Sequence, residues 1–352
     1  MKSKKTLLII LGITLIIATI FVHHAWGVKG TDRLTSEDIY HVWEEGKKIT
    51  NHLNPYTRII GNSLRENSKY PTYLPLSYYF ASTLSHFGAS RFIDFINIWK
   101  PINLFFHLCI GGVTFSIYYQ QRKPISGIVA CSILLLGRWS AYIINVQHLE
   151  FAAILPILIA GQQLNRKPKL SALMFGLSLS VKHVGIVLLP SFLLGLKANS
   201  NSGNSISSRK RILTYSAVAL IIPLIISIPF LLDQPSGFLL NMLFSTTREF
   251  GDHGKATGTR MILTGVDGTR LIMLALIIMN WVAQAKEKIN FWLASTLTLL
   301  IFLQFNAVVF AQYYIWLATF LLISCAYLTP TTPRQPTPEN STVGDQHLTQ
   351  DD

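Results

Sequence analysis

The sequence predicts an all-α polytopic membrane protein, and two observations support that prediction. Half of the 352 residues are hydrophobic and only 13% are charged, against roughly 25% charged residues in an average soluble domain. The apolar residues are gathered in blocks that approach or exceed the roughly 17–25 residues needed to cross a bilayer as a helix. These blocks are residues 6–22, 97–119, 125–143, 149–163, 170–196, 212–232, 268–284, 289–310 and 313–328. With the longest block divided in two, they predict about ten transmembrane helices.

The basic residues predict the orientation of these helices. The formal net charge is +13, but Lys and Arg are spread over short loops, which argues against a nucleic-acid partner. Loops rich in Lys and Arg usually face the cytoplasm. Such residues occupy the start of the chain and alternate loops: Lys2, Lys4, Lys5, Arg122, Lys123, Arg166, Lys167, Lys169, Lys197, Arg209, Lys210, Arg211, Lys286 and Lys288. We therefore expect a multi-pass protein of the cytoplasmic membrane with both termini inside.

The first apolar block and the loop after it set the frame for the rest of the chain. Met1 to Val22 has a basic start and an apolar stretch, but no good cleavage site follows, so we expect an uncleaved first helix. It delivers the loop 23–95 to the outer face. Within this loop, Tyr70 to Phe87 is aromatic-rich and contains two prolines. If this segment crossed the membrane, every later basic loop would fall outside, so we expect an interfacial or re-entrant helix.

The later blocks follow with short turns, except at three places. The run 170–196 is too long for one span and carries Lys182 at its middle, where a charge costs several kcal/mol; we expect a helical hairpin with Lys182 at its outer end. A second outer loop is predicted at 233–267. The Pro- and Thr-rich end, 329–352, is predicted to be a disordered cytoplasmic tail. Residues 1–328 would then form one transmembrane domain.

The sequence indicates neither a disulfide framework nor a metal site. Cys109, Cys131 and Cys325 lie in apolar blocks at unrelated spacings. His23 and His24 have no third ligand at helical spacing and are interpreted as an interfacial pair. We therefore assign no firm cofactor, and the sequence leaves a dependence on divalent metal open.

Most of the acidic charge outside the tail lies in the first outer loop. Ser36 is positioned to cap a short helix that begins with Glu37 and Asp38. A carboxylate just above the membrane can deprotonate an acceptor hydroxyl. The alternative is that both acids only favour the positive end of the helix dipole.

The order of several short motifs resembles that of type C glycosyltransferases, the polytopic enzymes that move a sugar from a polyprenyl-phosphate carrier. The similarity is greatest to bacterial mannosyltransferases that use polyprenyl-phosphate mannose. It covers roughly residues 5–328, and no single motif in it is specific. The motifs are Asp38-x-Tyr40, Gly46, Asn54-Pro55-Tyr56, Tyr70-Pro71, Pro75-Leu76, Arg91, Val146-Gln147-His148, Gly176 to Lys182, Leu189-Pro190 and Gln312-Tyr313-Tyr314. The family's tandem proline appears here as Pro71-Thr-Tyr-Leu-Pro75, a departure in the interfacial helix.

The resemblance implies roles for particular residues. The catalytic base falls on Asp38, with Glu37 and Asp32 as substitutes. Cations on the outer face would bind the departing phosphate, and the candidates are Lys182, Arg91 and Arg248. Substrate contacts are assigned to Tyr40, Asn54, Tyr56, Gln147, His148, His253, Gln312 and Tyr313.

Each of these residues also has a structural interpretation. Arg91 can reach the interface merely by snorkelling, Lys182 and His183 can mark a helix end, and Arg248 and His253 can be solvated loop residues. Tyr313 can belong to the aromatic belt at the membrane surface.

The resulting hypothesis is a membrane glycosyltransferase that moves a hexose from a polyprenyl-phosphate sugar, with mannose as the first candidate. The acceptor would be a lipid-linked glycan or a glycolipid at the outer face. Three alternatives stay open: a transporter or lipid flippase, a ligase that uses polyprenyl-diphosphate glycans, and a non-catalytic scaffold. Transporters often show internal repeats and helices broken at the membrane midplane, and neither is evident here.

Overall fold

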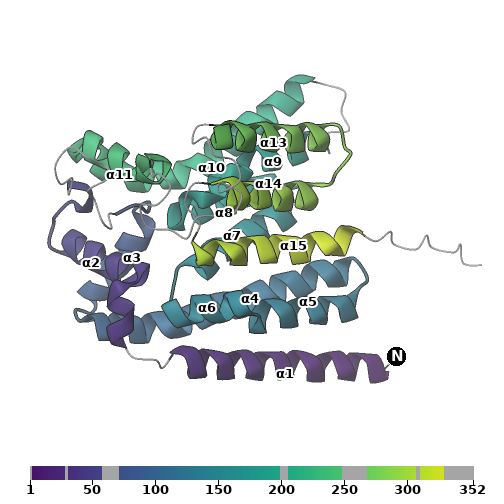
Figure 1. Ribbon diagram of the computed structural model, residues 1–352, viewed down its shortest axis with the longest axis horizontal. Coiled ribbons are helices and arrows are strands. Elements are labelled where there is room, and N and C mark those ends of the chain that lie inside the picture. Colours follow the sequence, from purple (N-terminus) through teal and green to yellow (C-terminus); the bar gives the residue numbers. More distant parts are fainter. Residues whose placement is uncertain are drawn as a thin grey trace, which may run out of the picture.

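The computed structural model describes residues 2–27, 31–57, 71–198, 205–247, 268–306 and 310–328, and every regular element in these ranges is helical (Figure 1). Within these ranges, five helical stretches are long and apolar enough to cross a membrane: Lys5–Gly27, Phe92–Gln120, Pro124–Val146, Arg209–Asp233 and Ala311–Leu328. Five shorter apolar helices accompany them. The protein is therefore a membrane-embedded helical protein, as the composition predicted.

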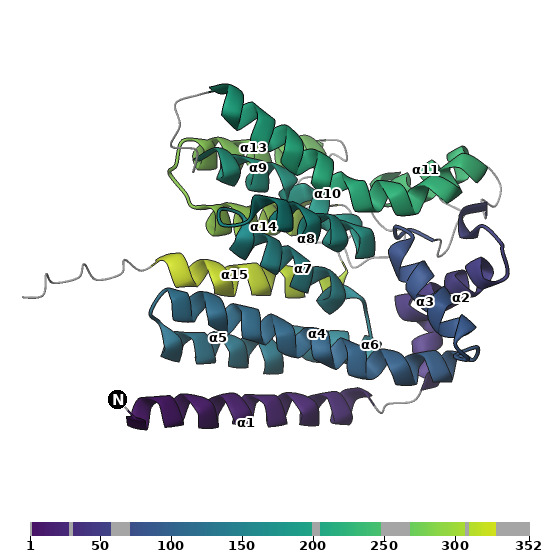
Figure 2. The same cartoon turned by 180° about the vertical axis from the view of Figure 1, so that it is seen from behind.

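The helices form a bundle with a cap at one end (Figures 1 and 2). The bundle contains α1 (Lys2–Gly27), α4 (Phe92–Gln120), α5 (Pro124–Leu136), α6 (Arg138–Val146), α7 (Glu150–Gln163), α8 (Pro168–Val181), α9 (Leu189–Ala198), α10 (Ser205–Asp233), α13 (Gly268–Ala285), α14 (Phe291–Phe305) and α15 (Tyr314–Leu328). The cap consists of η1 (Thr31–Ser36), α2 (Asp38–Thr50), η2 (Pro55–Thr57), α3 (Leu76–His86) and α11 (Pro235–Thr247). The start of α1 and the end of α15 lie at the other end of the bundle, which we call the termini end.

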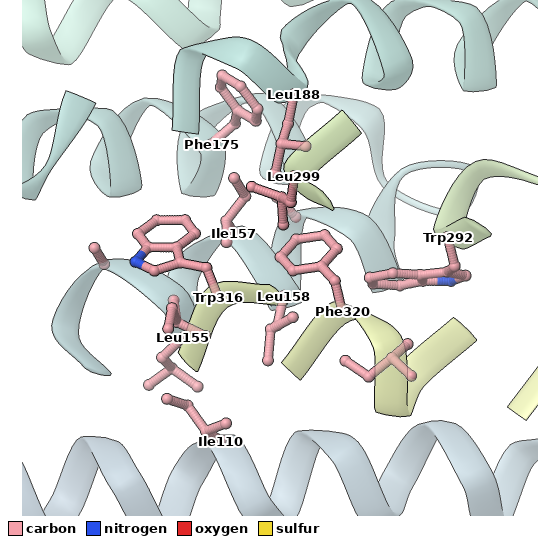
Figure 3. Packing of buried hydrophobic residues seen from close by; sticks show 14 of the residues in the cluster. Ile110, Leu155, Ile157, Leu158, Phe175, Leu188, Trp292, Leu299, Trp316 and Phe320 are labelled. Atoms are coloured by element: carbon pink, nitrogen blue, oxygen red, sulfur yellow. The ribbon is translucent and has the colours of Figure 1, made fainter. Parts of the chain in front are cut away.

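Two buried hydrophobic clusters hold these parts together. In the bundle, Trp316 and Phe320 of α15 face Ile157 and Leu158 of α7, and Leu299 of α14 packs beside them (Figure 3). A second cluster under the cap joins the start of α4 to the apolar faces of α2 and α3. Its members include Leu34, Ile39, Val42, Tyr56, Tyr78, Phe95 and Trp99. The cap is thus fixed to the bundle by its own core.

Three of the loops that carry basic residues lie at the same end of the bundle. The turn between α4 and α5 carries Arg122 and Lys123, and the turn between α13 and α14 carries Lys286 and Lys288; both turns lie at the termini end (Figure 1). Because α7 begins and α8 finishes at the cap end, the loop that joins them, which contains Arg166, also lies at the termini end.

The predicted boundaries of the first outer loop need correction. Helix α1 continues to Gly27 and α4 begins at Phe92, so the connection spans 28–91 instead of 23–95. Ser36 does not cap α2, because its hydroxyl donates to the carbonyl of Arg33 at 3.2 Å and Glu37 occupies the N-cap position. Tyr70 and the tail 329–352 lie outside the described residues.

The structure also shows the form of two other segments discussed above. The segment before Phe87 forms α3, a helix of 11 residues that lies in the cap and is too short to run through the bundle. The block 170–196 is broken at Lys182, whose extended backbone (φ −152°, ψ 114°) separates α8 from the 3₁₀ helix η3 (His183–Leu188) and from α9. The break lies at the cap end.

Gly46 allows α2 and α3 to pack closely. A Cβ atom at this position would lie 2.5 Å from the Cβ of Ala81 and 2.9 Å from backbone atoms of Tyr78 and Ser82. Backbone atoms cannot rotate out of the way, so a side chain would separate the two helices and loosen the cap.

We predict that Gly46→Ala lowers the stability of the detergent-solubilised protein by about 1–3 kcal/mol, the usual range for overpacking. Gly112→Ala is the matched control, because a Cβ there meets no atom within 4 Å and alanine is favoured over glycine in a helix by roughly 0.5–1 kcal/mol. The midpoint of thermal unfolding, followed by tryptophan fluorescence, should fall for Gly46→Ala only. Equal midpoints would contradict the close packing.

Candidate active site at the cap end of the bundle

Five charged side chains from three separate segments meet where the cap joins the bundle, and we call them the carboxylate cluster. Glu37 and Asp38 come from the start of α2, His148 from the turn before α7, Glu150 from the first position of α7, and Lys182 from the break after α8. Glu150 is fully buried, and His148 and Lys182 are nearly so, whereas the side chains of Glu37 and Asp38 are 31% and 38% exposed. The cluster therefore has a buried floor and an accessible carboxylate rim.

His148 lies at the centre of the carboxylate cluster. Its Nε2 atom lies 3.3 Å from Oε2 of Glu37, and its Nδ1 atom lies 3.6 Å from Oδ2 of Asp38 and 3.6 Å from Oε2 of Glu150. The ring of Tyr142 lies beside the imidazole, with 6.5 Å between the centroids. One imidazole thus connects the rim carboxylates to the buried one.

The conformation of Gln147 directs His148 into the cluster. Gln147 adopts a left-handed backbone conformation (φ 52°, ψ 35°), which ends α6 and reverses the chain before α7. The indole of Trp99 donates to the Gln147 carbonyl at 2.9 Å, and the amide of Asn103 donates to Oε1 of Gln147 at 3.2 Å. These bonds compensate an uncommon conformation for a residue other than glycine.

Lys182 and Glu150 form a buried ion pair and hydrogen bond beneath the rim. The ammonium of Lys182 also lies 5.3 Å from the ring centroids of Tyr73 and Tyr313. Cation–π contacts strengthen when the cation is desolvated, so both rings help to stabilise the buried ammonium.

Tyr73 ties the rim to the rest of the cap. Its hydroxyl donates to Oδ2 of Asp38 at 2.6 Å. Its backbone carbonyl accepts from the hydroxyl of Tyr56 at 2.8 Å, and its backbone N–H donates to the hydroxyl oxygen of Tyr78 at 3.2 Å. Because both polar groups of its backbone are engaged, the position of Tyr73 is well defined.

The surroundings raise the pKa values of two groups in the site, His148 and Tyr73. Burial alone would lower the pKa of His148, but the carboxylates of Asp38, Glu150 and Glu37 outweigh it and raise this pKa to about 9. Burial, together with the nearby charge of Asp38, raises the pKa of Tyr73 well above its ordinary value. At neutral pH, His148 is therefore a cation and Tyr73 a neutral hydrogen-bond donor.

Several residues predicted from the sequence meet in this site. Asp38, Glu37, His148, Lys182 and Tyr313 lie within it, and Gln147 and Tyr56 support it from behind.

Three other predicted contacts lie beside the site. Gln312 is 5% exposed and precedes Tyr313 in the 3₁₀ helix η4 (Ala311–Tyr313). Tyr40 packs edge-on against Phe92. Asn54 has a structural role, because its amide donates to Asp233 at 2.7 Å and its Oδ1 atom accepts from the backbone of Tyr56 at 2.9 Å.

Two of the cations predicted to bind phosphate are paired with carboxylates in the structure. Arg91 is 76% exposed and forms a bidentate pair with Asp94, both bonds being 2.8 Å long. Its charge is thereby compensated outside the cluster. Lys182 lies in the cluster but is paired with Glu150. Arg248, His253 and the side chain of Asp32 lie outside the described part of the chain.

Two members of this site were not predicted from the sequence. No role was predicted for Glu150, although an acid at the head of an apolar block signals a buried charge that needs a partner. Tyr73 was one of several tyrosines, and only its position between two prolines distinguished it. Of the pair Glu150 and Lys182, the sequence singled out one charge and not its partner.

Comparisons and metal geometry add little to these contacts. A comparison with protein-family models and with curated proteins finds no match for this chain. Within the described ranges, no group of three or more His, Cys, Asp or Glu side chains has an arrangement that would hold a metal ion. The interpretation of the site therefore depends on its own chemistry.

We predict that Lys182→Met lowers the stability by about 3–5 kcal/mol, because it leaves the carboxylate of Glu150 buried without its partner. The double variant Lys182→Met/Glu150→Leu should recover most of that loss, since both charges are then removed. Arg91→Gln, which breaks an exposed pair, is the control and should leave the midpoint of thermal unfolding unchanged. No recovery in the double variant would contradict the pairing.

The pKa of His148 also predicts a dependence of stability on pH. Because the pKa is higher in the folded protein than its ordinary value of 6.5, the protonated form stabilises the fold fully below pH 6.5. This contribution, on the order of 3 kcal/mol, is lost as the pH rises through about 9. The difference in unfolding midpoint between the parent protein and His148→Gln should therefore shrink between pH 7 and 10. His86→Gln, at an exposed position, should show no such change, and a constant difference for His148→Gln would refute the shift.

Proposed function

We propose that this protein is an inverting membrane glycosyltransferase of type C. It would move a hexose, with mannose as the first candidate, from a polyprenyl-phosphate sugar to a lipid-linked glycan or glycolipid. This proposal combines the motif resemblance with the chemistry of the carboxylate cluster, and Asp38 would be the catalytic base.

The observation that carries the proposal is the environment of Asp38. It is the more exposed of the two rim carboxylates, at 38%, and it lies above charged groups that are themselves buried from water. Tyr73 donates a hydrogen bond to it at 2.6 Å and His148 lies at 3.6 Å. A carboxylate held in this way has a fixed direction and can accept a proton from a hydroxyl at the rim.

The proposed reaction is a single displacement. The acceptor hydroxyl attacks the anomeric carbon of the donor sugar while its proton passes to Asp38. The bond from that carbon to the phosphate oxygen breaks, and the electron pair leaves with the polyprenyl phosphate. Because attack and departure occur on opposite faces of the sugar, the configuration at the anomeric carbon inverts.

The charges of the cluster assign different parts of this reaction to different residues. Three carboxylates face two cations when His148 is protonated, so the cluster carries one excess negative charge. An excess of this sign suits a base and not a phosphate site. We therefore assign Lys182 to the support of Glu150 and His148, and we assign the leaving phosphate to cations of the second outer loop, Arg248 first. Arg91 is not retained as a donor ligand.

The same proposal includes the membrane topology. About ten helices would cross the cytoplasmic membrane, with the basic loops of the termini end inside, as the positive-inside rule requires. Both chain termini would then be cytoplasmic, and the carboxylate cluster would face the outer side, where lipid-linked sugars and their acceptors meet.

The direct test is transfer of radiolabelled mannose from a short-chain polyprenyl-phosphate mannose to a membrane-lipid extract by the purified protein. We predict that Asp38→Asn lowers the rate by about 10²–10⁴-fold, the usual contribution of a general base. Glu44→Gln is the matched control, because Glu44 lies on the same helix, is 40% exposed and, within the described part of the chain, pairs with His41; its rate should equal that of the parent.

Other outcomes would distinguish the alternatives. Equal rates for Asp38→Asn and the parent would remove Asp38 as the base. No transfer from mannose, glucose, galactose or arabinose carriers would overturn the proposal. In that case, transfer from a polyprenyl-diphosphate glycan would indicate a ligase, and movement of the intact lipid-linked sugar across proteoliposomes would indicate a flippase.

A further inference from the structure

A polar pocket lies at the termini end of the bundle, away from the carboxylate cluster. It has a volume of about 510 Å³ and lies between the ends of α4, α7, α9 and α15 and the turn from α13 to α14. This volume falls within the roughly 300–1,000 Å³ range of small-molecule sites. Carboxamide side chains from several of these helices line it, including Gln121, Gln162, Gln284 and Asn290.

One wall of this pocket consists of aromatic rings that pack tightly. The rings of Trp292 and Tyr327 are nearly parallel, with 6.3 Å between centroids and 21° between planes. Trp292 lies directly over Gly161, where a Cβ atom would come within 2.5 Å of the indole. Glycine at this position lets the ring lie flat against α7, so the wall is part of the packed bundle.

Gln284 belongs to the wall of this pocket and carries a buried, unsatisfied acceptor. The residue is only 5% exposed, and its amide nitrogen donates to the carbonyl of Ser191 at 2.8 Å. Its Oε1 atom has no hydrogen-bond partner among the described residues. A buried oxygen in this state destabilises the fold, because it has lost its hydrogen bonds to water and gained none in return. A ligand that donates a hydrogen bond from a hydroxyl group would remove that cost.

The charged residues at the mouth of the pocket favour an anion. Arg166 and Lys288 line it together with a single acid, Glu287. Both cations belong to turns that carry further positive charge. Basic pockets between the ends of membrane helices bind anionic lipid headgroups, and a guanidinium matches the geometry of a phosphate with two parallel hydrogen bonds.

We propose that this pocket binds a phosphate ester that carries a free hydroxyl group. Arg166 and Lys288 would bind the phosphate, and the hydroxyl would donate to Oε1 of Gln284. Two sources share this chemistry: the headgroup of an anionic lipid such as phosphatidylglycerol, and a soluble ester such as glycerol 3-phosphate. The site is independent of the proposed sugar transfer, because it shares no residue with the carboxylate cluster.

The test compares ligands that differ in one group each. Binding of dioctanoyl phosphatidylglycerol to the detergent-solubilised full chain is measured by thermophoresis, alongside dioctanoyl phosphatidylmethanol and dioctanoyl phosphatidylcholine. Phosphatidylmethanol keeps the charge but lacks the hydroxyl, and phosphatidylcholine lacks both the net charge and the hydroxyl. We expect at least tenfold tighter binding of phosphatidylglycerol than of phosphatidylcholine, and an intermediate affinity for phosphatidylmethanol.

Variants assign each part of the ligand to a residue. Lys288→Gln should weaken phosphatidylglycerol binding at least fivefold. Lys286→Gln, in the same turn but outside the pocket, is the matched control and should leave binding unchanged. Arg166→Gln is a second surface variant that does not depend on the packing of the interior. It should weaken phosphatidylglycerol binding for the same reason as Lys288→Gln. Gln284→Leu should abolish the preference for phosphatidylglycerol over phosphatidylmethanol while both still bind.

The remaining outcomes decide between the sources or reject the site. Binding of glycerol 3-phosphate as tight as that of the lipid, with the same response to Lys288→Gln, would support the site and assign it a soluble ligand. Equal binding of all three lipids, or equal losses for Lys286→Gln and Lys288→Gln, would overturn the proposal.

Discussion

Two opposite charges buried side by side hold together the end of the bundle that bears the carboxylate cluster. Lys182 and Glu150 are each almost completely removed from solvent, and neither would be tolerated there alone. Their pairing fixes the end of α8 against the start of α7. His148, two residues before Glu150, is thereby held next to the same carboxylate, and the cap packs over all three. The accessible rim acids are positioned by a floor whose geometry this pair determines.

The cap adds a second constraint, because it packs over that floor. Its helices are too short to cross a membrane, and they are held by a hydrophobic core of their own. Tyr73 connects the two levels: its hydroxyl bonds to Asp38 while its ring lies against the ammonium of Lys182. Any movement of the cap relative to the bundle would change both contacts together. The chemistry of the rim and the packing of the cap are therefore coupled through one side chain.

Much of this arrangement could be predicted from the sequence, for reasons that differ from residue to residue. Apolar block length predicted the helical membrane class, and a lysine inside an apolar run predicted the break at Lys182, because a charge there needs a surface or a partner. The partner itself was not predicted, since Glu150 lies 32 residues away and only folding brings the two together. Arg91 was predicted to bind phosphate, but Asp94, one helical turn along, forms an ion pair with it and compensates its charge locally. Tyr73 could not be distinguished from its neighbours, because its role depends on where the cap sits.

The short separation between Glu150 and Lys182 along the chain has a consequence for biogenesis. The two residues belong to one helical hairpin, formed by α7 and α8, and a ribosome adds roughly 5–20 residues per second. The interval between the synthesis of the acid and that of the base is therefore only a few seconds. A hairpin inserted as a unit brings its own counterion, so the translocation machinery meets a paired acid and base at this end of the hairpin and not two isolated charges. The rim acids of α2, made earlier, then acquire their imidazole neighbour as soon as this hairpin is in place.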